Sequence, residues 1–242
     1  MRRRVRILIL VLISLLPSGI KRLVYRSLFG YQIGKRVKIG ISIIDCNRLI
    51  IDDDAKIGHG TIFWRCDEVK IGSRVVIGFL NLFRGGKLIT LDDYAMVLRL
   101  NVINAIVEPH FNVEPLSHFH LGYGSVITSE HRIDFTDHVS IGKQTILGGR
   151  NSSIWTHNRR NGGGVSIGDH CYIGSEIRMA PGSAIPSLSI VGIGAVVTGK
   201  IDQEGYLIAG VPARLVRPLN KEDRELIHDP TRLDLPQSNS IC

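Results

Sequence analysis

The sequence has few aromatic residues and cysteines, and it lacks a long hydrophobic run. Phe, Trp and Tyr make up 6% of its 242 residues, which argues against a core built mainly on rings. Its four cysteines form no Cys-x-x-Cys pair, so neither a disulfide framework nor a tight metal-ligand motif is indicated, and a reducing, cytoplasmic setting is expected. The longest apolar run, residues 7–16, is broken by Ser14 and is too short to cross a bilayer unaided.

Acidic residues are absent from the first 38 positions, which hold ten of the 30 Lys and Arg residues. The other 204 residues carry 20 basic and 22 acidic side chains. The formal net charge of +8 therefore belongs to the N-terminus. Because the rest of the chain has no basic bias, nucleic-acid binding is not expected.

The basic N-terminal segment, residues 1–32, predicts an amphipathic helix over residues 19–29. Apolar Ile20 and Leu23 lie on the face opposite Arg22 and Arg26. Such a helix favours peripheral contact of residues 1–29 with the inner face of a membrane. Two alternatives stay open, namely a cap on the end of a solenoid and a secretion signal, although no Ala-x-Ala-like cleavage site follows.

Glycine and branched aliphatic residues are abundant, and they recur with a period of six residues from Ile33 onward. Each unit begins with an aliphatic residue, usually followed by Gly or Asp. Examples are residues 33–38, 51–56, 57–62, 71–76, 121–126, 141–146, 167–172 and 191–196. The apolar residues do not recur at the i, i+3, i+4 and i+7 positions of a helix. Three such units close one 18-residue coil of a triangular prism, so the repeat predicts an all-β, left-handed parallel β-helix over residues 33–217.

Spacing between equivalent positions locates the coils and the loops that interrupt them. Ile33 to Ile51 is 18 residues, and Ile51 to Ile71 is 20, which predicts small bulged corners. Larger steps, from Leu91 to Leu121 and from residue 141 to residue 167, predict loops near residues 109–120 and 156–164. Loops that leave a rigid scaffold often carry function. Residues 218–242 are predicted to form a short charged helix followed by a polar tail.

The segment 154–175 and the stretches 190–200 and 209–217 resemble the hexapeptide-repeat acyltransferase superfamily, within it the maltose and galactoside O-acetyltransferase branch that includes bacterial surface-polysaccharide O-acetyltransferases. The resemblance implies a homotrimer that uses acetyl-CoA and needs no metal. It also implies that His157 is the catalytic base, and that Ser175 and Ile193 offer backbone groups to the pantetheine arm of CoA. The residues implied to lie near the adenine and phosphate end of CoA are Thr198, Lys200, Arg214 and Arg217.

This sequence departs from the family pattern at Gly199, which separates Thr198 from Lys200, and at Pro186, which replaces a glycine. These departures bear on the phosphate contacts. Trp155, His131 and Arg159 are predicted to contact the acceptor, expected to be a sugar hydroxyl of a surface polysaccharide or lipid-linked glycan.

Acyl transfer from a thioester to an alcohol needs a base for the hydroxyl proton, and an imidazole titrates near neutral pH. No Gly-x-Ser-x-Gly nucleophile motif is present, so direct transfer with His157 as base is predicted. Backbone N–H groups beside His157 are expected to stabilise the oxyanion. The alternatives are a non-catalytic β-helix scaffold and a zinc carbonic-anhydrase-like enzyme, for which His118 and His120 form the one close histidine pair.

Overall fold

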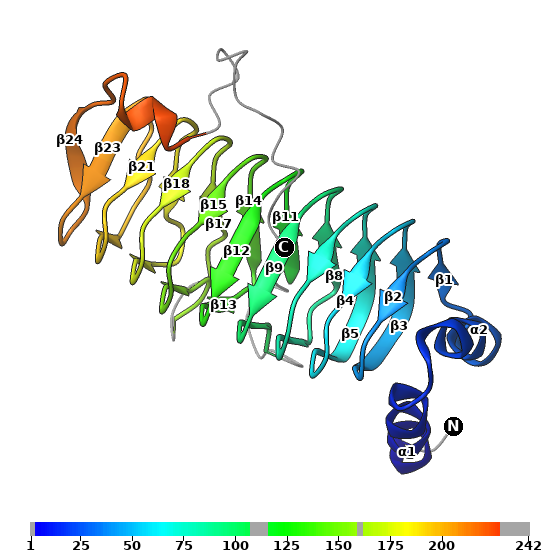
Figure 1. The fold of residues 1–242 in the computed structure, drawn as a ribbon. Coiled ribbons are helices and arrows are strands. Elements are labelled where there is room, and N and C mark those ends of the chain that lie inside the picture. Colours follow the sequence, from blue (N-terminus) through cyan, green and yellow to red (C-terminus); the bar gives the residue numbers. More distant parts are fainter. Residues whose placement is uncertain (1–2, 107–115, 159–161, 228–242) are drawn as a thin grey trace.

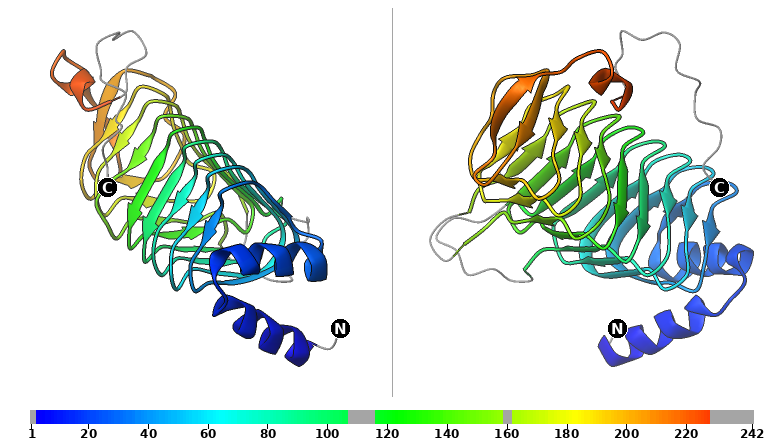
Figure 2. Two further views of the ribbon diagram at one scale, coloured as in Figure 1. Left: turned by 45° about the vertical axis from the view of Figure 1, so that its right-hand side comes forward. Right: turned by 60° about the vertical axis from the view of Figure 1, so that its left-hand side comes forward.

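A computed structural model describes residues 3–106, 116–158 and 162–227 of the chain. Short parallel strands stack into a β-helix of about eight turns, and two helices lie at its N-terminal end (Figures 1 and 2). The prediction of a left-handed parallel β-helix is confirmed.

Each coil contributes a short strand to each of three faces of a prism. The first face contains β1 (Gln32–Ile33), β3 (Ile43–Ile51), β5 (Ile62–Ile71), β8 (Leu88–Leu91), β11 (His118–Leu121), β14 (His138–Ile141), β17 (Val165–Ile167) and β20 (Ala184–Ile185). The second contains β2 (Lys38–Ile39), β4 (Lys56–Ile57), β6 (Val76–Ile77), β9 (Met96–Arg99), β12 (Val126–Ser129), β15 (Ile146–Leu147), β18 (Tyr172–Ile173), β21 (Ile190–Val191) and β23 (Tyr206–Ala209).

The third face begins with the first halves of the long strands β3 and β5, which turn a corner of the prism. It continues through β7 (Leu82–Arg84), β10 (Val102–Asn104), β13 (Arg132–Asp134), β16 (Ser153–Ile154), β19 (Arg178–Met179) and β22 (Val196–Val197). Neighbouring strands of the stack run parallel, so each coil presents its backbone groups to the next.

The register reproduces the spacing of the sequence repeat. Ile33 pairs with Ile51, and Ile51 pairs with Ile71. The residues at the two ends of each longer step also pair between neighbouring coils: Leu91 lies opposite Leu121, and Ile141 lies opposite Ile167. The loop predicted near residues 109–120 is too long at its end, because residues 118–120 belong to β11. Its residues 109–115, and residues 159–161 of the loop predicted near 156–164, lie outside the described part of the chain.

A bulge accounts for one extra residue in the second coil. Asp45 pairs with Trp64, but Cys46 pairs with Cys66. Arg65 is therefore the inserted residue, and its φ of 55° places it in the left-handed region. The prediction of bulged corners is confirmed here.

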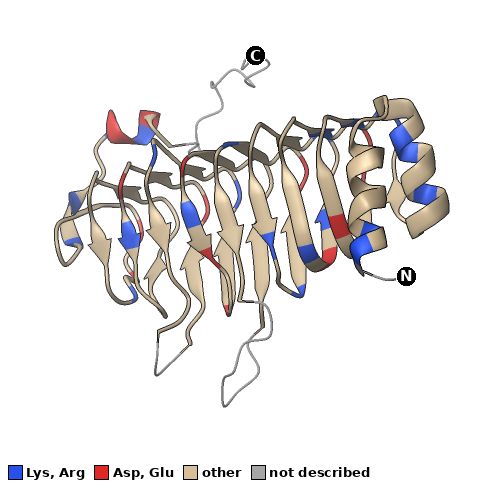
Figure 3. Ribbon diagram, turned by 90° about the horizontal axis from the view of Figure 1, so that it is seen from below, with Lys and Arg blue, Asp and Glu red and all other residues tan. Residues whose placement is uncertain are grey.

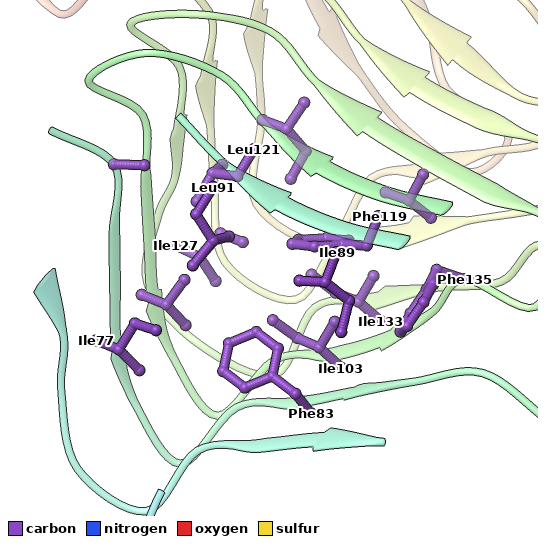
Figure 4. Close-up of a cluster of buried hydrophobic side chains, with 14 of the residues drawn as sticks. Ile77, Phe83, Ile89, Leu91, Ile103, Phe119, Leu121, Ile127, Ile133 and Phe135 are labelled. Atoms are coloured by element: carbon purple, nitrogen blue, oxygen red, sulfur yellow. The ribbon is translucent and has the colours of Figure 1, made fainter. Parts of the chain in front are cut away.

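The interior is a continuous stack of the aliphatic residues that open the repeats, together with a few phenylalanines (Figure 4). Phe63 and Phe83 pair in register and stack with their ring centroids 4.5 Å apart. Since every coil places its apolar residues above those of the previous coil, one continuous core extends along the prism.

Helix α1 (Arg3–Ser14) is followed by α2 (Ser18–Phe29), which covers the open end of the first coil. The Lys21 side chain is 1% exposed, and its Nζ donates to the carbonyls of Ser14, Ile39 and Gly40. Burial lowers the pKa of this lysine. The helix therefore satisfies carbonyls of the first coil, which has no preceding coil to cover it, and this agrees with the cap alternative. No helix in the described ranges is both long and apolar enough for a membrane span.

At the other end, β24 (Arg214–Pro218) pairs antiparallel with β23. A short 3-10 helix, η1 (Asp223–Glu225), follows. This is the only part of the predicted C-terminal helix within the described residues, and the polar tail from residue 228 lies outside them.

Candidate active site

His157 lies at the edge between the third and first faces, three residues after the inward-facing Ile154. Ile154 pairs with Ile133 of the preceding coil and with Met179 of the next. The chain then returns onto the strand, because His157 forms a bridge with Gly162 and the Gly163 N–H donates to the Thr156 carbonyl at 2.8 Å. The predicted loop is thus tied back at its base, which holds the histidine against the prism.

Asp134, at the end of β13 one coil earlier, contacts His157 directly. Its Oδ2 lies 2.7 Å from His157 Nδ1. The Asp134 side chain is 6% exposed and that of His157 is 24% exposed. A buried carboxylate beside a partly exposed imidazole is the arrangement that orients a histidine for proton transfer.

Two threonines saturate the same carboxylate. Thr136 donates its hydroxyl (2.6 Å) and its N–H (3.2 Å) to Oδ1. Thr156 donates its hydroxyl (2.9 Å) and its N–H (3.0 Å) to Oδ2. Both hydroxyl oxygens also accept a backbone N–H, from Ile106 and Asp137 respectively, so their protons are directed at Asp134.

This hydrogen-bond pattern determines the state of the pair. A carboxylate that accepts from two hydroxyls and two backbone N–H groups has no proton of its own to donate. His157 Nδ1 must therefore be the donor to Asp134. In the neutral ring, Nε2 then carries the lone pair, which is the form that can accept a proton from an alcohol.

Asp134 was missed by the sequence analysis, which considered His157 without a partner. The alignment of one coil with the next would have pointed to Asp134. Ile133 pairs with Ile154, so Asp134 and Trp155 occupy equivalent positions in neighbouring coils, and His157 follows two residues later. An acidic residue one coil before a candidate base is the pattern to look for.

Trp155 lies on the outside of the third face and is 48% exposed. Its N–H donates to the Met179 carbonyl at 3.1 Å. Trp155 is the first residue after β16 and precedes His157 by two residues. The backbone N–H groups of Trp155 and Thr156 are both engaged, so these two are not the oxyanion donors expected beside His157.

His131 occupies a different environment from the one predicted. Its side chain has 0% exposure, with Nε2 2.9 Å from Thr128 Oγ1 and Nδ1 accepting the Ser152 N–H at 3.2 Å. Burial lowers the pKa of this histidine to about 4. A side chain without exposed surface is not in a position to contact an acceptor, so we correct that prediction. Arg159, also predicted to contact the acceptor, lies outside the described residues.

The histidines of the zinc alternative lie on the first face. His120 Nε2 is 3.0 Å from Asp92 Oδ2. His118 pairs in register with His138, and burial, with the charges of Lys87 and His138, lowers its pKa. Within residues 3–106, 116–158 and 162–227, no three His, Cys, Asp or Glu side chains gather closely enough to hold a metal ion.

Ser175 and Ile193 stack in neighbouring coils, as the sequence predicts. Tyr172 and Ile173 pair with Ile190 and Val191, and the Gly194 N–H donates to the Ser175 carbonyl at 3.0 Å. The Ile193 side chain is 76% exposed. Both residues follow strands of the second face, so they lie at the edge between the second and third faces.

Thr198 and Lys200 lie on the same edge of the prism as His157. Met179 pairs with both Ile154 and Val197, so Thr198 is two coils beyond Trp155, a separation of about 10 Å from the usual strand spacing. Lys200 bridges to Ala184, and both side chains are exposed. The predicted donor-binding residues of one chain are therefore divided between the two edges of the third face.

Arg214 and Arg217 are exposed on the terminal strand β24. The Arg214 Nη1 donates to the adjacent Ala213 carbonyl. Arg217 forms two hydrogen bonds with the Asp223 carboxylate. That ion pair would have to open before Arg217 could bind a phosphate, whereas Arg214 forms no ion pair with any residue that the structure describes.

Two O-acetyltransferases of Escherichia coli K12 are similar in sequence to this chain. Galactoside O-acetyltransferase is 29% identical over 131 residues, which cover 50% of this chain and 64% of that protein. The lipopolysaccharide biosynthesis O-acetyltransferase WbbJ is 37% identical over 60 residues, which cover 25% of this chain and 30% of WbbJ. The sequence similarity to these O-acetyltransferases thus extends over half of this chain at most. The chain spans less than two thirds of either relative.

No family model matches the sequence. Among solved structures, similarity extends to a hexapeptide transferase family protein from Anaplasma phagocytophilum, with 15% identity, a TM-score of 0.39 and coverage of 81% of this chain and 82% of that one. The polysialic-acid-specific acetyltransferase NeuO has 14% identity and a TM-score of 0.37, with coverage of 73% and 86%.

Proposed function

We propose that the protein is an acyl-CoA-dependent O-acyltransferase with His157 as its general base. The Asp134–His157 pair is the observation that carries this proposal. A buried carboxylate with four other donors around it holds the imidazole in the tautomer that accepts a proton at Nε2. The related O-acetyltransferases favour acetyl as the transferred group.

In the proposed reaction, His157 Nε2 accepts the proton of the acceptor hydroxyl as the oxygen attacks the thioester carbonyl. Asp134 stabilises the imidazolium that forms. When the tetrahedral intermediate collapses, the carbon–sulfur bond breaks, an ester remains on the acceptor, and the imidazolium returns the proton to the CoA sulfur. Atoms and charge balance without an enzyme-bound acyl group.

The proposed acceptor is a sugar hydroxyl of a surface polysaccharide or a lipid-linked glycan. The relative WbbJ belongs to lipopolysaccharide biosynthesis, which supports this class. Trp155, exposed beside His157, offers an apolar ring face for a sugar. Arg159 remains a proposed acceptor contact on sequence grounds.

We further propose a homotrimer with the donor between adjacent prisms. The division of Ser175 and Ile193 from Thr198 and Lys200 supports this assembly, because an edge from each of two copies would complete one donor groove. Light scattering tests it, with an expected mass of three times 26.8 kDa, and a monomer would contradict it.

The N-terminal helices are proposed to rest on a membrane surface, where a lipid-linked acceptor would be present. Leu8, Leu12 and Leu15 of this segment are 58 to 66% exposed, and unpartnered apolar surface of this kind is typical of contact sites. Flotation with phospholipid vesicles tests the contact. Protein that stays in the aqueous phase would contradict it.

The test of the reaction measures thiol release from acetyl-CoA with a panel of soluble and lipid-linked sugars. Wild-type protein should release CoA only when a suitable acceptor is present. His157→Gln should lower kcat by about 10³-fold, because it removes the base but keeps a polar side chain of similar reach. Unchanged release in this variant would reject His157 as base, and a panel in which no sugar supports release would reject this acceptor class.

A further inference from the structure

A groove with basic walls lies beside the beginning of α2, at the opposite end of the stack from the donor residues. Its volume is about 850 Å³. The charged residues in its lining are five basic and one acidic: Arg22, Arg36, Lys38, Lys56, Arg74 and Asp54. We call it the basic groove.

The repeat itself concentrates positive charge there. Lys38 and Lys56 pair directly in register on neighbouring coils, and like charges opposite each other disfavour the pairing. Asp54 is held by Arg36 through two hydrogen bonds of 2.6 Å. Within the described part of the chain, neither lysine forms an ion pair, so the groove keeps an excess of positive charge.

The helix side of the groove adds donors to this charge. Arg22 Nε is buried and has no hydrogen-bond partner among the described residues. Gly19 lies in the first turn of α2, whose N–H groups form the positive end of the helix dipole. The Ser18 hydroxyl accepts the Ile39 N–H at 3.0 Å, which fixes this turn against β2.

Exposed apolar side chains of α2 lie next in sequence to Gly19 and Arg22, which line the groove. Leu23 lies one turn after Gly19, and it is 64% exposed, while Ile20 is 50% exposed. Figure 3 shows basic residues on both helices and no acidic ones. The first acidic residue of the chain is Asp45. A cation-lined groove bordered by exposed aliphatic side chains matches a ligand that is anionic at one end and apolar at the other.

We propose that the basic groove binds the phosphate of an anionic phospholipid headgroup. The phosphodiester accepts charge-assisted hydrogen bonds from Arg22, Lys38 and Lys56, and the acyl chains contact the exposed apolar residues of α2. This lipid site is separate from the proposed acyl-transfer site. It would determine which membrane surface the protein binds, and it takes no part in the reaction.

The test compares two double variants with equal loss of charge. Lys38→Gln with Lys56→Gln removes two groove cations, whereas Lys35→Gln with Lys143→Gln removes two cations outside it. Flotation is measured with phosphatidylcholine vesicles and with vesicles that contain about 30% phosphatidylglycerol, at fixed ionic strength. None of the four substituted lysines is buried, so both variants should remain folded under the assay conditions, which a thermal melt of each variant checks.

The groove variant should bind the anionic vesicles at least about tenfold more weakly than wild type, and the control variant should stay within about twofold. Equal losses in both variants would overturn the proposal in favour of diffuse electrostatic attraction. Millimolar inorganic phosphate should not displace the protein. Displacement at matched ionic strength would show that the groove takes free phosphate and would overturn the lipid assignment.

Acetyl transfer to a soluble acceptor should be the same in wild type and the groove variant. This measurement separates the two proposals. A failure of the vesicle prediction with intact transfer rejects the groove alone, whereas vesicle binding without any transfer rejects the proposed reaction alone.

Discussion

Two histidines in neighbouring coils, His131 and His157, have opposite hydrogen-bonding roles. His157 Nδ1 donates to the buried Asp134 carboxylate at 2.7 Å. His131 Nδ1 accepts a backbone N–H from Ser152, and its Nε2 donates to Thr128 Oγ1. The two rings therefore hold their single proton on different nitrogens when neutral.

The neighbours of an imidazole, rather than its place in a loop or coil, thus decide what the ring can do. A carboxylate partner stabilises a charged ring, as the proposed role of His157 requires. Neutral partners and full burial oppose the charged ring, so His131 stays neutral and contributes to the coil. Variants that exchange or remove these partners should abolish the contrast between the two rings.

Among substitutions of the residues around the two rings, the largest effect on turnover is expected from Asp134→Asn. The asparagine amide would present N–H donors where the carboxylate now accepts, which favours a proton on His157 Nε2 and removes the base. We expect kcat to fall on the order of 10²-fold with little change in the KM for acetyl-CoA. Wild-type turnover in this variant would reject the pair as the source of basicity.

A smaller effect is expected from Thr156→Val, which keeps the side-chain shape but removes a donor to Oδ2, the oxygen that contacts His157. We expect kcat to fall about tenfold through loss of orientation. Thr136→Val is the matched control, because Thr136 donates to Oδ1, and its effect should be about threefold at most. A larger loss of kcat in Thr136→Val than in Thr156→Val would contradict the assignment of Oδ2 as the oxygen that orients His157.

The smallest effect on turnover is expected from His131→Asn, which should stay within about twofold of wild type at pH 7. The substituted amide side chain would extend the ladder in which Asn101 Nδ2 donates to Asn81 Oδ1. The effect of this substitution should instead appear in stability as the pH falls.

The sign of that pH effect follows from burial. The pKa of His131 is lowered to about 4 in the folded protein, so the unfolded chain takes up a proton first as the pH drops below about 6.5. This group should therefore reduce the free energy of unfolding by about 2 kcal/mol between pH 7 and pH 5. Denaturant unfolding at both values should show a smaller loss in His131→Asn, and an equal loss would contradict the buried, neutral ring.

Much of the fold could be predicted from the repeat because each coil is built from local units whose inward residue is visible in the sequence. Ile33, Ile51 and Ile71 were expected to stack, and they pair in register. The start of the loop after Ile154 was found from the enlarged spacing between Ile141 and Ile167. The helix expected over residues 19–29 is present as α2, and its buried Lys21 shows how it covers the first coil.

The β-helix and its coil boundaries followed from the spacing of residues along the chain. The choice of Ser175, Ile193 and His157 as site residues came mostly from the resemblance to known acyltransferases. The folded arrangement was needed to show that Asp134 is the partner of His157 and that His131 is buried. It also placed Thr198 and Lys200 on a different edge from Ser175. The fold was visible in the sequence because hydrophobic stacking depends on the period of the inward-facing residues. The partners of the histidines were not visible, because hydrogen bonds between side chains at the corners depend on how the chain turns there.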